Sequence, residues 1–341
     1  MYIPAVAMIG RLRLGETADV EHIVEPYLSR AKQSLENPTG SHQAGHLVFG
    51  ELYTRTRNRR YLDLARAAAD LGFDERGAPL ESMPMHSEMS DAVFMGCPIL
   101  AQVGRLTGEP KYFDMALRHM RFIQKLDLRP DGLYRNSPLH DAAWGRGNAF
   151  PALGLALALG DFPREHPGFG EMLRAFRAHM AALARHQDRT GMWRQVIDVP
   201  GSYRELSATC MIATAMLRGI RNGWLDAKTY QPLVDRAWYA VRARIAPSGR
   251  LVDVCTGTGK QTSLEAYLER PGRGDGAPVR NGVDGRTDAL RLARYAARNK
   301  DFVLRERRNG LRADARACEG AARGAGVPAS DRARVWGGAP R

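Results

Sequence analysis

Apolar residues recur along this chain mostly at helical spacing, and the alternation typical of strands is nearly absent. Some breaks are sharply marked, as where Gly108 follows one apolar-periodic stretch and Pro110 opens the next. The pattern predicts about twelve helices, near residues 3–14, 19–35, 42–57, 60–72, 89–106, 110–126, 142–159, 168–187, 203–222, 227–246, 260–269 and 286–299. We therefore expect an all-α protein.

Three of these helix-like stretches end in a turn that contains glycine and leads into a short, bulky apolar segment. The glycines are Gly132, Gly191 and Gly249, which lie 59 and 58 residues apart. A repeat of that length, filled each time by two amphipathic stretches, predicts a helical hairpin repeated around a toroid. The connecting loops would then emerge on one face, and a functional site is expected there.

Composition and length fit one large domain. Hydrophobic residues make up 44% of the chain and charged residues 26%, which are ordinary values for a globular protein. No linker-like segment interrupts the first 270 residues, so we expect a single barrel domain over 1–300 and a basic, poorly ordered tail over 301–341. No apolar run is long enough to span a bilayer, and no basic residue precedes the short apolar run at 3–9, so a cytoplasmic location is expected.

The net charge of +13 raises the question of nucleic acid. Residues 271–341 hold 15 Arg and one Lys against six Asp and two Glu, a net of +8, and leave +5 for residues 1–270. The excess therefore lies mostly in the tail, where a solvated basic extension is the simpler interpretation. Nucleic acid is not the partner that the main domain favours.

Cysteine and histidine usage predicts neither a metal site nor a cofactor. The four cysteines are scattered, with no metal-knuckle or redox-pair spacing. His42 and His46 lie four residues apart on a predicted helix, but no further ligand accompanies them locally.

Two aspartates, Asp91 and Asp141, stand at the start of apolar helices where loops of the expected site face would lie. Helix capping is the simpler interpretation of each, because an acidic group in the first turn accepts backbone N–H bonds. Asp141 has richer surroundings: Tyr134, Trp144 and Phe150 could form apolar walls that raise the pKa of the carboxyl into the range of a general acid.

Further polar and aromatic residues of the kind that bind an acidic sugar follow in the same loops. Rings stack on sugar faces, and guanidinium groups grip carboxylates in a bidentate manner. The residues of these types are Tyr134, His140, Trp144, Arg146, Trp193, Gln195 and Arg204.

These segments resemble glycoside hydrolase family 105, the unsaturated rhamnogalacturonyl hydrolases, which are related to the family 88 unsaturated glucuronyl hydrolases. The resemblance covers about residues 40–270. The segments that carry it are Ser90-Asp91-Ala92-Val93-Phe94-Met95, Gly104 to Tyr112, Ala143-Trp144-Gly145-Arg146-Gly147-Asn148, Gly191 to Thr209 and Cys255-Thr256-Gly257-Thr258-Gly259.

The resemblance implies an (α/α)6 barrel and a hydrolase that acts on lyase-generated oligosaccharides. Such enzymes protonate C4 and add water at C5 of a 4,5-unsaturated uronic acid, after which the hemiketal collapses and releases the next sugar. The resemblance implies that Asp141 acts as acid and base, and that Asp91 assists by binding substrate and tuning Asp141. It also implies that Trp144, Arg146, Trp193, Gln195 and Arg204 line the sugar subsites. His42, His140 and Tyr134 complete the predicted substrate-binding residues.

Two other functions remain open. A non-catalytic sugar-binding relative would keep Trp144, Trp193 and Arg146 without needing Asp141, and a polyanion-binding protein would depend on the basic tail and lose affinity with salt. A barrel left unclosed by residues 286–341 would expose an apolar seam and favour a homo-oligomer.

Overall fold

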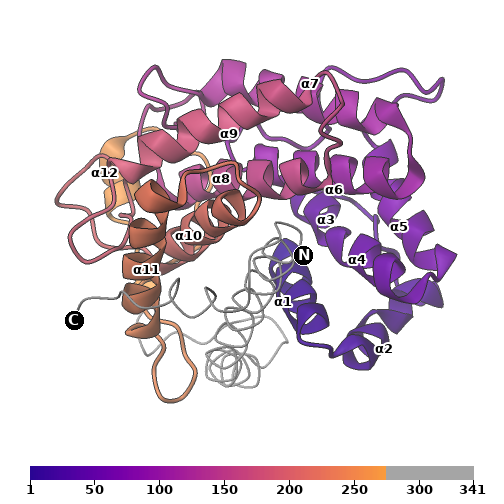
Figure 1. Ribbon diagram of the computed structural model, residues 1–341, viewed down its shortest axis with the longest axis horizontal. Coiled ribbons are helices and arrows are strands. Elements are labelled where there is room, and N and C mark those ends of the chain that lie inside the picture. The colour runs from indigo at the N-terminus through magenta and orange to yellow at the C-terminus, as the bar shows by residue number, and fades with distance from the viewer. Residues whose placement is uncertain (274–341) are drawn as a thin grey trace, which may run out of the picture. The chain divides into compact units, whose positions relative to one another are not determined.

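The computed structural model of the protein describes residues 1–273, and helices dominate that part of the chain (Figure 1). Its helices are α1 (Tyr2–Arg13), α2 (Thr17–Leu28), α3 (Gly40–Gly45), α4 (Leu47–Thr56), α5 (Arg59–Asp70), α6 (Ala92–Thr107), α7 (Pro110–Asp127), α8 (Gly145–Asp161), α9 (Phe169–Ala184), α10 (Leu206–Arg221), α11 (Ala227–Arg242) and α12 (Leu264–Leu268). Two short strands, β1 (Val254–Cys255) and β2 (Gly272–Arg273), pair antiparallel. The predicted helix at 286–299 and the predicted tail lie outside the described residues.

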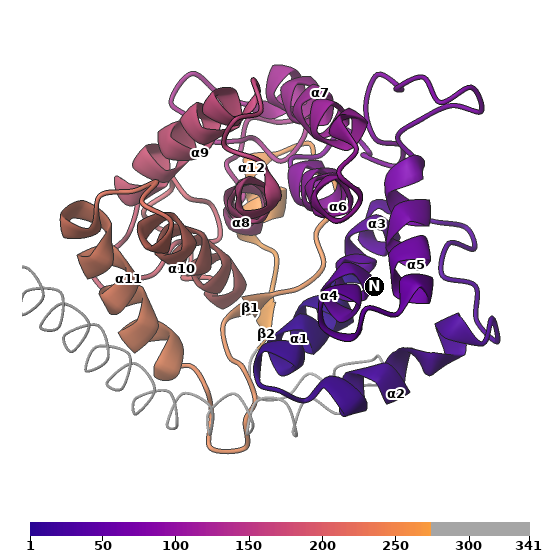
Figure 2. The same cartoon turned by 45° about the vertical axis from the view of Figure 1, so that its right-hand side comes forward.

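Consecutive helices pair into hairpins, and the hairpins stand side by side. α4 packs on α5, α6 on α7, α8 on α9 and α10 on α11, while α8 also packs on both α6 and α10. Figure 2 shows α4, α6, α8 and α10 forming an inner row with α5, α7, α9 and α11 outside it. α1 packs on α3 and α4 and thereby joins the inner row at its N-terminal end.

The apolar pattern of each helix explains its layer. α6 buries every residue from Ala92 to Gly104, and α8 is buried nearly all round, which is the pattern of a helix enclosed on all sides. α7 and α11 are amphipathic and bury one stripe only.

The predicted glycine turns are confirmed and occur four times in the described residues. Gly77, Gly132, Gly191 and Gly249 all have positive φ, between 78° and 90°. Each turn is closed by an equivalent backbone hydrogen bond, in which an N–H group donates to the carbonyl group four residues later. The four donors are the N–H groups of Asp74, Arg129, Asp188 and Ala246. The sequence analysis did not identify the copy at Gly77, which lies 55 residues before Gly132 and is followed by Ala78-Pro79-Leu80.

Several helix boundaries differ from the prediction. The predicted helix at 42–57 is two helices, α3 and α4, and α2 ends at Leu28 rather than near residue 35. α8 begins at Gly145 instead of residue 142 because Trp144 pairs with Val196 in an isolated β-bridge. α10 begins at Leu206, since the Glu205 side chain accepts the first backbone N–H groups of that helix.

Long connections join each outer helix to the next inner helix. They cover residues 71–91, 128–144 and 185–205. The return connections are short, as at Gly108, where a left-handed residue ends α6 and Pro110 opens α7. The N-termini of α6, α8 and α10 therefore meet at the end of the hairpins that carries the long loops.

Candidate active site

The first turns of α6, α8 and α10 bring three charged side chains to the loop end of the hairpins. Asp91 immediately precedes α6, Arg146 lies in the first turn of α8, and Glu205 immediately precedes α10. Helix N-termini carry partial positive charge, so this end of the fold favours negatively charged groups.

Glu205 is fully buried and has a structural task. Its carboxylate accepts the backbone N–H groups of Ser207 and Ala208 at 3.2 and 2.5 Å, and that of Cys255 at 2.9 Å. It therefore caps α10 and fastens the loop around β1 to that helix. The sequence analysis did not assign it a role.

Arg146 is held in one orientation by its neighbours. Its guanidinium donates to the hydroxyl of Ser207 at 3.1 Å and to the carbonyl groups of Cys255 and Thr256 at 2.9 Å. Glu205 lies 3.8 Å away, which gives the cation a buried counter-charge. Such a fixed cation needs little reorganisation to stabilise a negative charge on a ligand.

Asp91 does not cap α6, because its side chain makes no capping hydrogen bond. Burial raises the pKa of its carboxyl to about 6, against the opposing charge of Arg146. A carboxyl with such a pKa exchanges protons near neutral pH, which is the property that acid–base catalysis requires.

Tyr2 of α1 also belongs to this cluster, and the sequence analysis missed it. Its ring packs edge-to-face on Phe94 and Phe150, with centroid distances of 5.8 and 5.5 Å. Burial raises the pKa of the phenol, which also lies within the electrostatic reach of Arg146, Asp91 and Glu205. The motifs used in the sequence analysis all lie after residue 39, so no signal pointed to Tyr2.

Asp141 lies in the loop before α8, and its surroundings differ from those expected. Its side chain is 79% exposed, and it pairs with Arg135 at 3.0 Å. The backbone carbonyl of Asp141 accepts a hydrogen bond from Arg129 at 2.8 Å. The expectation that aromatic rings would enclose this carboxyl is therefore wrong for this structure, since Tyr134, Trp144 and Phe150 are buried in the interior.

The predicted aromatic and amide residues are core supports. Trp193 is fully buried and donates its indole N–H to the carbonyl of Leu183 at 2.8 Å. Gln195, also fully buried, accepts from the indole of Trp144 at 3.3 Å and donates to the carbonyl of Tyr267 at 3.1 Å. The faces of Trp193 and Tyr134 are not available to a ligand in this structure.

Trp144 differs from these residues through its contact with Arg146, whose guanidinium lies 4.8 Å from the ring centroid. Its role is to support the cation, because only 2% of the residue is exposed.

The remaining predicted residues have local partners. Arg204 pairs with Asp188 at 2.5 Å. The Nδ1 atom of His42 contacts the hydroxyl and backbone N–H of Thr39 at 2.8 and 3.1 Å, which caps α3. Nδ1 of His140 accepts the backbone N–H of Ala142 at 3.0 Å.

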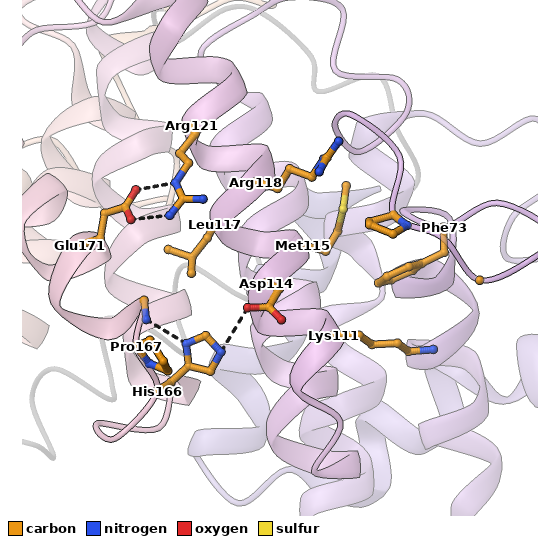
Figure 3. Close-up of a pocket in the computed structure, with 13 residues that line it drawn as sticks. Phe73, Lys111, Asp114, Met115, Leu117, Arg118, Arg121, His166, Pro167 and Glu171 are labelled. Carbon is orange, nitrogen blue, oxygen red and sulfur yellow. Dashed lines mark hydrogen bonds and ion pairs between the residues drawn. The ribbon is translucent and has the colours of Figure 1, made fainter.

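A groove of about 560 Å³ lies elsewhere, along α7 (Figure 3). It is lined by charged side chains that largely neutralise one another: Arg121 binds Glu171 through two bonds of 2.7 and 2.5 Å, and His166 lies 3.5 Å from Asp114. None of the predicted site residues lines this groove. Its position on an outer helix separates it from the cluster at the inner-helix N-termini.

Within residues 1–273, no group of three or more His, Cys, Asp or Glu side chains is arranged to hold a metal ion. Cys97, Cys210 and Cys255 are free thiols. No helix in this same part of the chain is long and apolar enough to cross a membrane.

Several proteins of known activity are similar to this chain in sequence. The chain is 28% identical over 190 residues to the unsaturated rhamnogalacturonyl hydrolase YesR of Bacillus subtilis. The matched region covers 53% of each protein. It is 30% identical over 177 residues to an unsaturated 3S-rhamnoglycuronyl hydrolase of Formosa agariphila, covering 44% of this chain and 45% of that protein. The chain thus spans about half the length of the curated relatives it matches.

Solved structures show the fold. A crystal structure described as a possible member of the GH105 family from Salmonella enterica matches with a TM-score of 0.69 at 21% identity, over 85% of this chain and 79% of that one. The unsaturated glucuronyl hydrolase of Bacillus sp. GL1 matches with a TM-score of 0.55 at 17% identity, over 75% and 78% of the two chains. The (α/α)6 barrel class expected from the sequence is confirmed.

The sequence profile of the family described as Glycosyl Hydrolase Family 88 matches residues 18–274, which is most of the chain and includes every predicted site residue. This protein therefore belongs to Glycosyl Hydrolase Family 88.

Proposed function

We propose that this protein is a hydrolase that removes a 4,5-unsaturated uronic acid from the non-reducing end of oligosaccharides produced by polysaccharide lyases. The observation that carries the proposal is a partly buried carboxyl with a raised pKa, Asp91, within the electrostatic reach of a fixed cation, Arg146, where helix N-termini meet. Family membership and the activities named for the relatives supply the reaction class.

The reaction consists of a hydration followed by a spontaneous collapse. A proton adds to C4 while a water oxygen bonds to C5, and that water gives up one proton, so the double bond becomes a hemiketal. The hemiketal opens to a ketone at C5, which leaves a hemiacetal at C1 that expels the next sugar as an alcohol. No glycosyl-enzyme bond is required, so the spacing rules for paired carboxylates in other glycosidases do not apply.

We propose Asp91 and Asp141 as the catalytic carboxyls. Asp141 is accessible and would give a proton to C4 and take one from water. Asp91, with its pKa near 6, would bind the substrate and tune the charge around Asp141. Both precede inner helices that pack directly on each other, α6 and α8.

We propose that the substrate carboxylate lies within the field of Arg146 and the helix N-termini. Arg146 keeps its position through three acceptors on the chain itself, so a bound anion would not have to order it. His42, His140 and Arg204 remain proposed contacts for sugars further from the cluster. The scattered cysteines favour a reducing compartment, and we propose the cytoplasm as its location.

The test is turnover of a panel of lyase-generated unsaturated disaccharides, beginning with galacturonyl-rhamnose, followed through loss of the ultraviolet absorbance of the enol ether. Wild-type protein should consume the absorbance and release the neutral sugar. Asp141→Asn and Asp91→Asn should lose turnover, whereas the control Asp114→Asn, at an exposed carboxyl in the α7 groove, should keep it.

A folded wild-type protein that binds these disaccharides without consuming the enol ether would instead identify a non-catalytic sugar-binding relative. Undiminished turnover in Asp141→Asn would remove that residue from the catalytic pair.

A further inference from the structure

Asp127, the last residue of α7, has a carboxyl group that the reaction proposed above does not use. The residue is fully buried, and neither carboxyl oxygen has a hydrogen-bond partner. Its backbone carbonyl accepts the N–H of Arg135 at 3.0 Å, which fixes the start of the loop that leads to Asp141. Buried polar atoms are nearly always paired, so this carboxyl calls for an explanation.

Electrostatics favour the neutral form of Asp127. An unpaired carboxylate is costly to bury, and the C-terminus of α7 adds partial negative charge at the same place. Burial raises the pKa of Asp127 to about 7. Among the neighbouring charges, Arg135 and Lys260 lower the pKa, while Asp91 and Glu88 raise it. Lys260 is itself engaged with Glu88 at 3.1 Å, which leaves Arg135 as the principal counter-charge.

Arg135 lies between two carboxyl groups. Its Nε atom is 3.7 Å from an oxygen of Asp127, and its Nη1 atom is 3.0 Å from an oxygen of Asp141. The guanidinium is also anchored by the carbonyl of Leu126, which accepts from Nε at 2.9 Å and from Nη2. One cation is therefore shared by a buried acid and an exposed acid.

We propose that Asp127 is a positioning residue for Asp141 and acts through Arg135. When Asp127 is neutral, Arg135 is free to hold Asp141 in place; when Asp127 ionises, it competes for the guanidinium and weakens that hold. The assignment rests on the proposed function only in so far as Asp141 is catalytic. The linkage among the three side chains is a property of the folded protein and can be measured without substrate.

The functional consequence is an alkaline limit to activity. Asp127 loses its proton as the pH rises through about 7, so the hold on Asp141 weakens above that pH. The logarithm of kcat/KM for wild-type protein should fall on the alkaline side. The asparagine of Asp127→Asn stays neutral at every pH and keeps the shape of the side chain. In this variant the decline of kcat/KM should occur at a pH higher by at least about one unit.

An unchanged alkaline limb in Asp127→Asn would overturn the proposal, because a purely structural role would alter the height of the profile and not its position. Arg135→Gln provides the second arm. Without the shared cation, the activity of this variant should be low at every pH. Adding Asp127→Asn to Arg135→Gln should no longer shift the pH at which kcat/KM falls on the alkaline side.

The substrate-free measurement is the pH dependence of urea unfolding. Subtracting the curve of Asp127→Asn from that of wild-type protein isolates the titration of Asp127. The same subtraction is then made in an Asp141→Asn background, where Arg135 has lost its exposed partner. In that background the ionised form of Asp127 should interact more strongly with Arg135, so its apparent pKa should fall by on the order of one unit.

Asp131→Asn serves as the matched control, since Asp131 is a neighbouring carboxyl that pairs with Arg129 and not with Arg135. It should leave the midpoint of the Asp127 titration unchanged. Equal midpoints in the wild-type and Asp141→Asn backgrounds would overturn the linkage even in a fully active enzyme. A shifted midpoint in a protein without turnover would support the linkage while rejecting the proposed function.

Discussion

The guanidinium of Arg146 lies over the indole ring of Trp144, 4.8 Å from its centroid, and only Gly145 separates the two residues at the start of α8. The ring supports one face of the guanidinium, and its N–H groups donate to three acceptors in other segments of the same chain, on Ser207, Cys255 and Thr256. A lysine cannot reproduce this arrangement, because its ammonium is a point charge without a planar fork.

Replacing Arg146 by Lys should therefore reduce kcat/KM by about 100-fold, the usual cost of losing a fixed group that stabilises developing charge. Steady-state kinetics on an unsaturated disaccharide measure the effect. Arg121→Lys is the matched control, since the guanidinium of Arg121 is also held by hydrogen bonds, in its case two solvent-exposed bonds to Glu171. Similar losses in the two variants would argue against a special role for Arg146.

Asp91→Asn should abolish turnover and yet stabilise the fold at neutral pH. The folded-state pKa of Asp91 is raised from 3.8 to about 6, so the native state holds a proton between those pH values that the unfolded state has lost. Stability of the wild-type protein therefore falls as the pH rises through this window, by at most about 1.4 kcal/mol per pH unit. The asparagine variant lacks this fall.

Urea unfolding at pH 4 and pH 7 tests this sign. The stability of Asp91→Asn relative to wild type should be higher at pH 7 than at pH 4. An equal difference at both pH values would mean that the carboxyl of Asp91 does not carry its proton into this range.

The glycine turns provide a matched pair of variants. A Cβ atom at Gly191 would collide with the backbone carbonyl of Arg236, whereas a Cβ atom at Gly77 would meet nothing within 4 Å. Both residues have positive φ, so each alanine variant carries a backbone penalty of about 1 kcal/mol. Gly191→Ala should lose substantially more stability in urea unfolding, because rigid backbone must also move; equal losses would show that the turn adapts freely.

Trp193→Phe separates a core role from a sugar-binding role. The substitution removes the hydrogen bond to Leu183 and leaves a small void, which together should cost about 2–3 kcal/mol of unfolding free energy. KM for a disaccharide should stay near the wild-type value at temperatures where the variant is folded. A large rise in KM with unchanged stability would restore the stacking role first expected from the sequence.

Much of the fold could be predicted from sequence because helical periodicity and glycine turns are local signals. The hairpin repeat and the turns at Gly132, Gly191 and Gly249 followed from them, while α3 and α4 were merged because no residue between Gly45 and Leu47 breaks a helix strongly. The layer of each helix could have been inferred as well, since α6 and α8 lack a polar face.

Side-chain roles were harder to predict, because residue type does not reveal which way a side chain points. Trp193 and Gln195 have the chemistry of sugar contacts, but both face the interior between hairpins. Tyr2 and Asp127 joined the charged cluster only through tertiary packing, far in sequence from the motifs at Asp91 and Arg146. Long-range contacts of this kind leave no spacing pattern to recognise.

The most direct test of the central claim is the reaction run in D2O, with the product examined by NMR at early times. Hydration by a positioned acid predicts one deuterium on a single face of C4 in the released uronate, together with loss of the C4=C5 double bond and release of the neutral sugar at the same rate. Release of the sugar with an unsaturated uronate that carries no deuterium would contradict the account, since the bond broken would then be the glycosidic bond itself.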